Sequence, residues 1–123
     1  MEWEFRADAP IYTQLCEQLT LAIVSGVFGA GERLPAVREL AVDAGVNPNT
    51  VQRALSELER GGLVYTQRTA GRFVTEDYER IERERQKLAE SRARDFLAAM
   101  EKLGYDHAGT VDLLEQMREG RMQ

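Results

Sequence analysis

The sequence predicts a mainly α-helical fold with one small β-hairpin, arranged as an N-terminal winged helix-turn-helix and a short two-helix C-terminal tail. Apolar residues recur at spacings of three and four through most of the 123 residues, which is typical of amphipathic helices. A short turn containing a glycine joins two of these segments, as in a helix-turn-helix. Two short apolar runs around a polar turn follow directly and predict the hairpin. We expect the domains to cover residues 1–76 and 77–123.

The first predicted helix begins near Pro10, which suits a first turn, and ends near Ser25. Its inward stripe is expected to contain Ile11, Leu15, Leu19, Ala22 and Ile23. A second, short helix is expected from Val37 to Ala44, and Gly45 supplies the turn that ends it.

The third predicted helix has Asn47 as its N-cap and Pro48 in its first position, and it stops at Gly61-Gly62. The hairpin should consist of strands at Leu63–Thr66 and Arg72–Thr75 around a polar turn. Two strands alone are marginally stable in water, so we expect the apolar residues of the hairpin to close the core of the three helices.

A long charged helix and a last short helix are predicted after Glu76, with Gly104 ending the first and Asp106 capping the second. Two helices cannot enclose a core of their own, so the economical partner for their apolar faces is the same pair from a second subunit. The residues expected at this homodimer interface are Ile81, Leu88, Phe96, Leu97, Met100, Leu103, Val111 and Leu114.

The formal net charge of −5 argues against binding to a polyanion, but the charge is unevenly distributed. Residues 33–72 hold six arginines and four acids, a local balance of +2, whereas residues 76–123 hold twelve acids and nine bases. Local field governs contact with phosphate, so the acidic tail does not exclude nucleic-acid binding.

Several classes of protein are disfavoured by what the sequence lacks. It has no apolar run long enough to span a bilayer and no secretory signal pattern, so we expect a cytoplasmic protein without a membrane partner. One cysteine, Cys16, cannot form an intrachain disulfide and is expected to be a small buried hydrophobe. One histidine, His107, cannot supply a metal site. No nucleophile motif or phosphate-binding glycine loop is present, so no enzyme, cofactor or metal is expected.

Four motifs occur in order between Pro10 and Val74: GERLPAVREL, GVNPNT, RALSELERGGL and RFV. This run closely resembles the DNA-binding domain of the GntR family of bacterial transcription regulators, and the short tail resembles that of the YtrA-type subfamily. The resemblance implies a sequence-specific regulator, in particular a repressor that binds a palindromic operator as a homodimer, and control of a transporter operon. About forty-eight residues remain for the tail, too few for a large ligand-binding domain. Any unknown small-molecule effector would have to bind beside the tail helices or at the dimer interface.

The resemblance also assigns contacts with double-stranded DNA to the second helix, the recognition helix and the wing, at Arg38, Asn47, Pro48, Asn49, Thr50, Gln52, Arg68 and Thr69. Arg53 and Arg72 are added to this set because arginine binds phosphate or guanine. For the asparagines and Gln52, an amide side chain can pair with N6 and N7 of adenine. The chain departs from the family pattern at Ala36, where a serine often caps the second helix, and at Thr69, where a glycine is frequent.

Alternatives remain at two of these residues and for the function. Asn47 is as readily explained by capping as by base contact, and Arg53 can pair with Glu57 one helical turn further on. The alternative function is that of a winged helix that contacts only proteins, and the acidic net charge is the reason for considering it.

Overall fold

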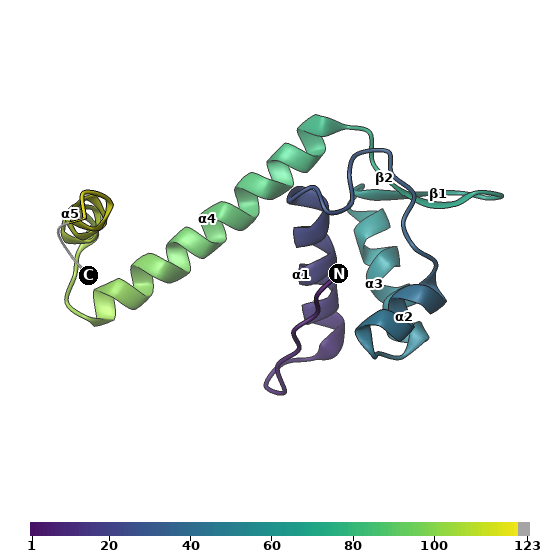
Figure 1. Cartoon of the computed structure of the whole chain (residues 1–123), viewed down its shortest axis with the longest axis horizontal. Coiled ribbons are helices and arrows are strands. Elements are labelled where there is room, and N and C mark those ends of the chain that lie inside the picture. The colour runs from purple at the N-terminus through teal and green to yellow at the C-terminus, as the bar shows by residue number, and fades with distance from the viewer. Residues whose placement is uncertain (121–123) are drawn as a thin grey trace. The chain divides into compact units, whose positions relative to one another are not determined.

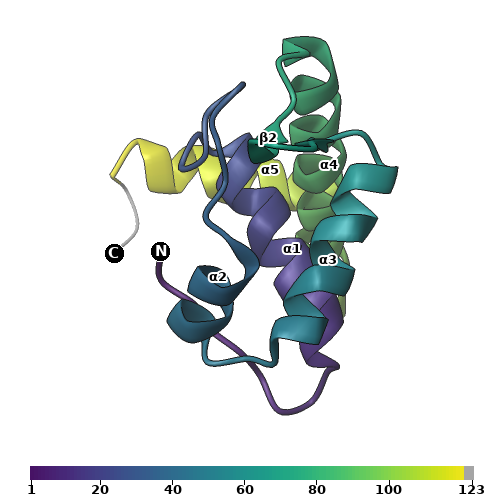
Figure 2. The same cartoon turned by 90° about the vertical axis from the view of Figure 1, so that its right-hand side faces the viewer.

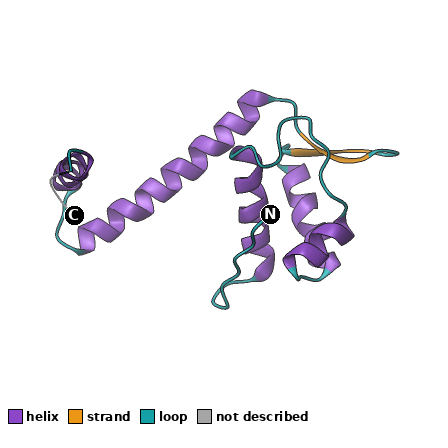
Figure 3. Ribbon diagram, viewed as in Figure 1, coloured by secondary structure: helices purple, strands orange, loops and turns teal. Residues whose placement is uncertain are grey.

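The computed structural model describes residues 1–120, and these residues contain five α-helices and one two-stranded sheet (Figure 1; Figure 3). The elements are α1 (Ile11–Val24), α2 (Val37–Ala44), α3 (Pro48–Arg60), β1 (Val64–Gln67), β2 (Gly71–Val74), α4 (Tyr78–Lys102) and α5 (His107–Arg118). The chain divides into two units, Met1–Arg85 and Gln86–Gln123, so that the first turns of α4 belong to the first unit. The predicted mainly helical fold with a small hairpin is confirmed.

The core of the first unit is built around α3, which packs against α1, α2 and β1 (Figure 2). Its inward residues Val51, Ala54, Leu55 and Leu58 are all buried and stand three or four positions apart, as one helical face requires. Leu15 and Leu19 of α1 are also buried, and each fully buried leucine contributes about 1.5–3 kcal/mol. The prediction for Ile11 is wrong, since it is 38% exposed at the first position of α1, one turn before the core.

Residues 1–9 form an N-terminal arm that lies along α1 and is held by two glutamines of that helix. The amide of buried Gln14 accepts from the N–H of Arg6 at 2.7 Å and donates to the carbonyl of Arg6 at 2.8 Å. Gln18, one turn further on, makes the same pair of bonds with Glu4. Because residues 4 and 6 are two positions apart, the two amides bind the arm much as a neighbouring strand would.

The hairpin is antiparallel, and Val64, Tyr65, Thr66 and Gln67 stand opposite Val74, Phe73, Arg72 and Gly71. Each strand lies one residue away from its predicted bounds, β1 later and β2 earlier. The other edge of β2 is also paired: Leu34 N–H donates to the carbonyl of Arg72 at 2.8 Å, and Val74 N–H donates to that of Glu32 at 2.9 Å. This third extended segment was not predicted, because three residues between a glycine turn and Pro35 show no strand periodicity.

Two arginines attach the beginning of α4 to the first unit. Arg85 donates from Nε and Nη2 to the carbonyl of Val24, the last residue of α1, at 3.1 and 2.9 Å. Arg80 donates from Nη1 to the carbonyl of Gly61, the C-cap of α3, at 2.9 Å. Gly62 has a φ of +82°, and a Cβ there would lie 2.8 Å from Nη1 of Arg80, so glycine permits this close approach.

The residues expected at a dimer interface fall into three groups. Ile81 is 6% exposed and belongs to the first unit. Because its own chain already covers it, Ile81 is not available for contact with a second subunit. Leu88, Leu97 and Met100 are half-buried. The rest, Phe96, Leu103, Val111 and Leu114, are exposed.

The second unit contains the remainder of α4 and the whole of α5. Asp106 caps α5, as predicted, by accepting from the N–H of Gly109 at 2.8 Å. Thr110 is 1% exposed, and its hydroxyl donates to the carbonyl of Asp106 at 2.8 Å. Among the helices of residues 1–120, none is both long and apolar enough to cross a membrane.

Candidate nucleic-acid interface

The start of α3 is fixed by a side-chain cap and a proline. The side-chain oxygen of Asn47 accepts from the N–H of Asn49 at 2.8 Å, and Pro48 occupies the first helical position, where its missing N–H costs nothing. Asn47 is therefore a cap, which leaves its amide nitrogen as the free part of the side chain. Pro48 and Asn49 are exposed, while Thr50 is half-buried.

A tight turn sets α3 against α2. Gly45 has a φ of +70°, and the N–H groups of Gly45 and Val46 both bond to the carbonyl of Ala41, closing the end of α2. Residues 45–47 alone separate the two helices, which is the helix-turn-helix connection that the sequence predicts. Short rigid connections of this kind fix the direction in which a following helix presents its exposed face.

Arg38 is exposed on α2 and has no ion pair with any residue that the structure describes. The helix it sits on has Ala36 as its N-cap, and no side chain accepts from the first helical N–H groups there. Glu39 makes the opposite half of a capping box, since its Oε1 accepts from the N–H of Ala36 at 3.3 Å.

The wing ends in a three-residue turn of Arg68, Thr69 and Ala70. The N–H of Ala70 donates to the carbonyl of Gln67 at 3.1 Å, and Gly71 then takes a φ of +108° to re-enter the sheet. Arg68 and Thr69 are both exposed, and Arg68 has no ion pair within residues 1–120. The tip therefore offers one unpaired positive charge.

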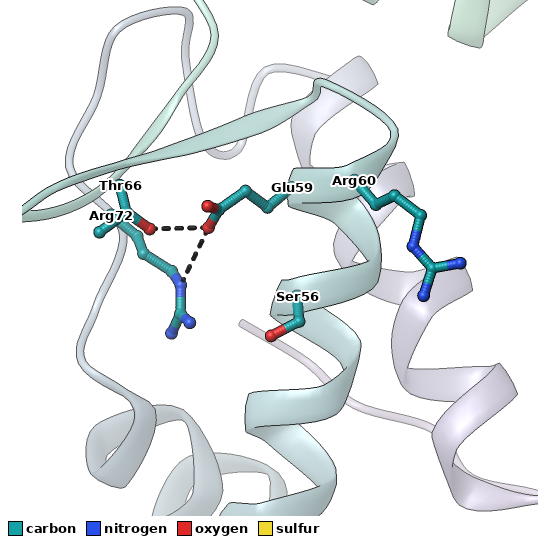
Figure 4. Close-up of a pocket in the computed structure, with 5 residues that line it drawn as sticks. All are labelled: Ser56, Glu59, Arg60, Thr66 and Arg72. Carbon is teal, nitrogen blue, oxygen red and sulfur yellow. Dashed lines mark hydrogen bonds and ion pairs between the residues drawn. The ribbon is translucent and has the colours of Figure 1, made fainter.

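A chain of polar contacts connects the wing with α3 (Figure 4). Thr66 and Arg72 stand opposite each other on the two strands, and both reach Glu59 of α3. The hydroxyl of Thr66 donates to Oε1 of Glu59 at 2.7 Å, and Nε of Arg72 lies 3.6 Å from the same oxygen. Arg72 also donates from Nη1 to Oε1 of Gln52 at 3.3 Å.

These contacts surround an open depression lined by Ser56, Glu59, Arg60, Thr66 and Arg72 (Figure 4). The structure thus brings two predicted contact residues, Gln52 and Arg72, into direct contact. It also adds Glu59 and Thr66, which sequence reasoning missed. Thr66 could have been found from the hairpin alone, because the strand pairing places residue 66 opposite residue 72 once the turn is known.

Arg53 has a different partner from the one considered in the sequence. Its guanidinium lies 4.3 Å from the centre of the Tyr12 ring on α1, a cation–π contact. Glu57 pairs instead with Arg60 at 3.2 Å. Arg53 therefore packs across the α1–α3 junction.

The acids of the predicted interface all have partners. Glu39 accepts from Ala36, Glu57 pairs with Arg60, and Glu59 holds Thr66 and Arg72. Asp43 accepts from the indole N–H of Trp3 at 2.7 Å, a link from the N-terminal arm to α2 that the sequence does not suggest. Arg33, Arg38 and Arg68 are exposed and form no ion pair within residues 1–120, so their positive charges are available to an anionic partner.

No cluster suited to a metal ion occurs in the described part of the chain, where no three His, Cys, Asp or Glu side chains are grouped appropriately. Cys16 is half-buried rather than fully buried as expected. Burial raises the pKa of its thiol above the ordinary value, while a hydrogen bond with Tyr12 acts in the opposite direction.

Comparison with known proteins gives concordant matches. The family model "Bacterial regulatory proteins, gntR family" matches residues 11–74. The uncharacterized HTH-type transcriptional regulator YhcF of Bacillus subtilis is 35% identical over 120 residues, covering 98% of this chain and 99% of that protein. The HTH-type transcriptional repressor YtrA of the same species is 42% identical over 72 residues, covering 58% of this chain and 55% of YtrA.

Two solved structures extend the comparison. A GntR family transcriptional regulator from Listeria monocytogenes has a TM-score of 0.84 and 38% identity, covering 91% of this chain and 98% of that one. The DNA-binding domain of AraR, solved in complex with operator ORX1, has a TM-score of 0.56 and 28% identity, covering 61% of this chain and 96% of that one.

Proposed function

This chain belongs to the GntR family of bacterial regulatory proteins and is a DNA-binding transcriptional regulator, and from that premise we propose that it acts as a homodimeric repressor on a palindromic operator. In this proposal α3 enters the major groove, the wing tip approaches the neighbouring minor groove, and the bound dimer blocks the promoter. The observation that supports it is the exposed polar start of α3, with Asn49 and Gln52, together with two exposed arginines that form no ion pair within residues 1–120, Arg38 on α2 and Arg68 on the wing.

The chemistry of this surface suits duplex DNA. Asn49 and Gln52 are exposed near the start of α3, and recognition helices contact base edges with their first turns. Arg38 and Arg68 lie before and after them in the chain, where phosphate contacts would fix the orientation of the helix without reading sequence. Glu57 and Glu59 are paired with Arg60 and Arg72, so these two carboxylates oppose a polyanion less than unpaired acids would.

Dimerisation is supported by the apolar residues of the second unit. Phe96, Leu103, Val111 and Leu114 are 43%, 72%, 44% and 46% exposed in the single chain. A second copy is the occupant that also explains a palindromic site, because a two-fold axis would set two α3 helices about 34–36 Å apart, one turn of DNA. The DNA-binding domain of AraR, which is similar to the first unit, has been solved in complex with operator ORX1.

Arg38→Ala tests the DNA contact. DNA flanking the protein's own gene is first footprinted to locate the operator, and the adjacent genes show whether the operon encodes a transporter, as the family resemblance implies. We expect the variant to lower operator affinity about tenfold or more and to reduce the slope of log K against log salt by about 1 per subunit. Thermal stability should hardly change, because Arg38 is exposed and unpaired within residues 1–120.

Arg83→Ala is the matched control, since it removes one exposed positive charge from the same unit away from the predicted interface. Its affinity and salt dependence should follow the unchanged protein. Equal affinity of the Arg38→Ala and unchanged proteins would overturn the assigned contact. Failure of the unchanged protein to bind any duplex at low salt would instead favour a winged helix that contacts proteins.

A further inference from the structure

Gln52 accepts a hydrogen bond from the wing, and this bond orients its amide. Arg72 donates to Oε1 of Gln52, and Arg72 is itself positioned by Glu59, which also accepts from Thr66. The Arg72 side chain is 20% exposed, so it is largely enclosed between the strand and the helix. The chain Thr66–Glu59–Arg72–Gln52 therefore fixes the last side chain from the direction of the wing.

The chemistry of arginine decides which atom of Gln52 remains available. A guanidinium carries five N–H donors and no acceptor, so the amide atom that faces it must be the carbonyl oxygen. The amide nitrogen, with two donors, is left to face outward. A bond from a charged donor is stronger than a neutral one, and removal of water at a DNA interface strengthens it further.

Resting on the function proposed above, we propose that Gln52 reads its base as a donor only, and so selects guanine over adenine. Guanine presents two acceptors in the major groove, N7 and O6, to which the two N–H groups of the amide can donate. Adenine presents the N7 acceptor beside the N6 donor, and pairing with both requires the amide oxygen and nitrogen side by side at the base edge, whereas the bond from Arg72 turns the oxygen toward the wing. The wing thus sets the base preference of the recognition helix through Arg72.

The experiment uses the full chain and the operator found by footprinting. The affinities of the unchanged protein and of Gln52→Ala are measured on operators that differ at single base pairs. In each half-site, the base pair contacted by Gln52 is the one whose identity affects the affinity of the unchanged protein but not that of the variant. At that pair the unchanged protein should bind the guanine operator about two- to tenfold more tightly than the adenine operator, the range expected for one neutral hydrogen bond. All comparisons are ratios between two operators, so general losses of affinity cancel.

Two variants change the preference in different directions. Arg72→Ala frees the carbonyl oxygen, so the preference should move toward adenine, which can then take the paired bonds. Gln52→Glu places acceptors alone at the position, so the preference should move to cytosine, whose N4 is a donor. If Arg72→Ala lowers the melting temperature too far for use, Arg72→Met, which keeps a long side chain but has no donor for Gln52, carries the test, while Gln52→Glu confirms that residue 52 contacts this base pair.

Arg60→Ala is the control, because Arg60 lines the same depression but pairs with Glu57 rather than with Gln52. It should keep the guanine preference. An adenine preference in the unchanged protein, or an unaltered guanine preference when the Arg72 donor is removed, would overturn the inference while leaving operator binding established. Failure of the unchanged protein to bind any duplex would refute the proposed function, and this inference with it.

Discussion

Ala36 leaves the start of α2 with half of a capping box. Glu39 accepts from the N–H of residue 36, but an alanine side chain cannot accept from the helix in return. The backbone at Ala36, with φ −65° and ψ 156°, already has the extended geometry of an N-cap. The departure from the family pattern at this position thus has a local energetic consequence without a change of fold.

Ala36→Ser should therefore stabilise the protein, because its hydroxyl can accept from an N–H of the first turn. We expect the free energy of unfolding to rise by about 0.5–2 kcal/mol, measured by urea denaturation. Ala93→Ser makes the same chemical change at an exposed position inside α4 and should give no gain. Equal effects of the two substitutions would show that residue 36 does not cap α2.

The raised pKa of Cys16 gives stability a pH dependence. The folded chain holds the thiol proton more tightly than the unfolded chain, whose cysteine pKa is about 8.5. This contribution is complete below the unfolded pKa and is lost as the pH rises through the folded pKa. Cys16→Ala should consequently lose less stability than the unchanged protein between pH 7.5 and pH 10.5 in urea denaturation. Parallel losses in the two proteins would contradict burial as the cause.

At the scale of elements, helix ends connect distant parts of the chain. The C-termini of α1 and α3 carry unpaired carbonyls, and Arg85 and Arg80 of α4 donate to them. Cations are also favoured there by the helix dipole. The beginning of α4 is therefore part of the winged unit, and the direction in which α4 starts is fixed by the ends of α1 and α3.

Arg85→Ala should destabilise the first unit, since it removes two hydrogen bonds to Val24. The side chain is 53% exposed, so we discount the value for a charged hydrogen bond and expect a loss of about 1–2 kcal/mol. The melting temperature should fall by roughly 3–8 °C. Arg83→Ala, at an exposed position in the same turn of α4, should change it by less than about 0.5 kcal/mol. A smaller effect of Arg85→Ala than of Arg83→Ala would refute this attachment.

Local periodicity and local chemistry account for the elements that the sequence predicts well. The stripe of α3, the cap at Asn47 and the turn at Gly45 each depend on neighbours within a few positions. The attachment of α4 does not, because Arg85 and Val24 are 61 positions apart and an arginine in a charged helix looks like solvated surface. The pairing of Glu59, Arg72 and Gln52 was equally hidden, since it depends on how the wing folds back toward α3.

At the scale of the whole molecule, the two units differ in how far they bury their own side chains. The first has buried residues on all three of its N-terminal helices and on both strands. Of the residues described from 86 to 120, Thr110 is the buried one, and large apolar side chains there remain exposed. A unit that covers so little of its own apolar surface gains stability from association, whereas the first unit has a core without it.

The double variant Leu103→Glu/Leu114→Glu tests whether a second copy covers this surface. Both side chains are well exposed in the single chain, so the charges should prevent association without unfolding the first unit. We expect a monomeric mass by light scattering at micromolar concentration and an affinity for the full operator lower by about 10²–10⁴, the advantage that linkage of two binding sites confers. Binding to an isolated half-site should be unchanged. Val27→Glu, a charge at a 58% exposed position in the first unit, should leave the dimer intact. If the double variant stays dimeric, or if the unchanged protein is itself a monomer, the exposed face of the second unit is not the subunit interface and the palindromic operator loses its structural basis.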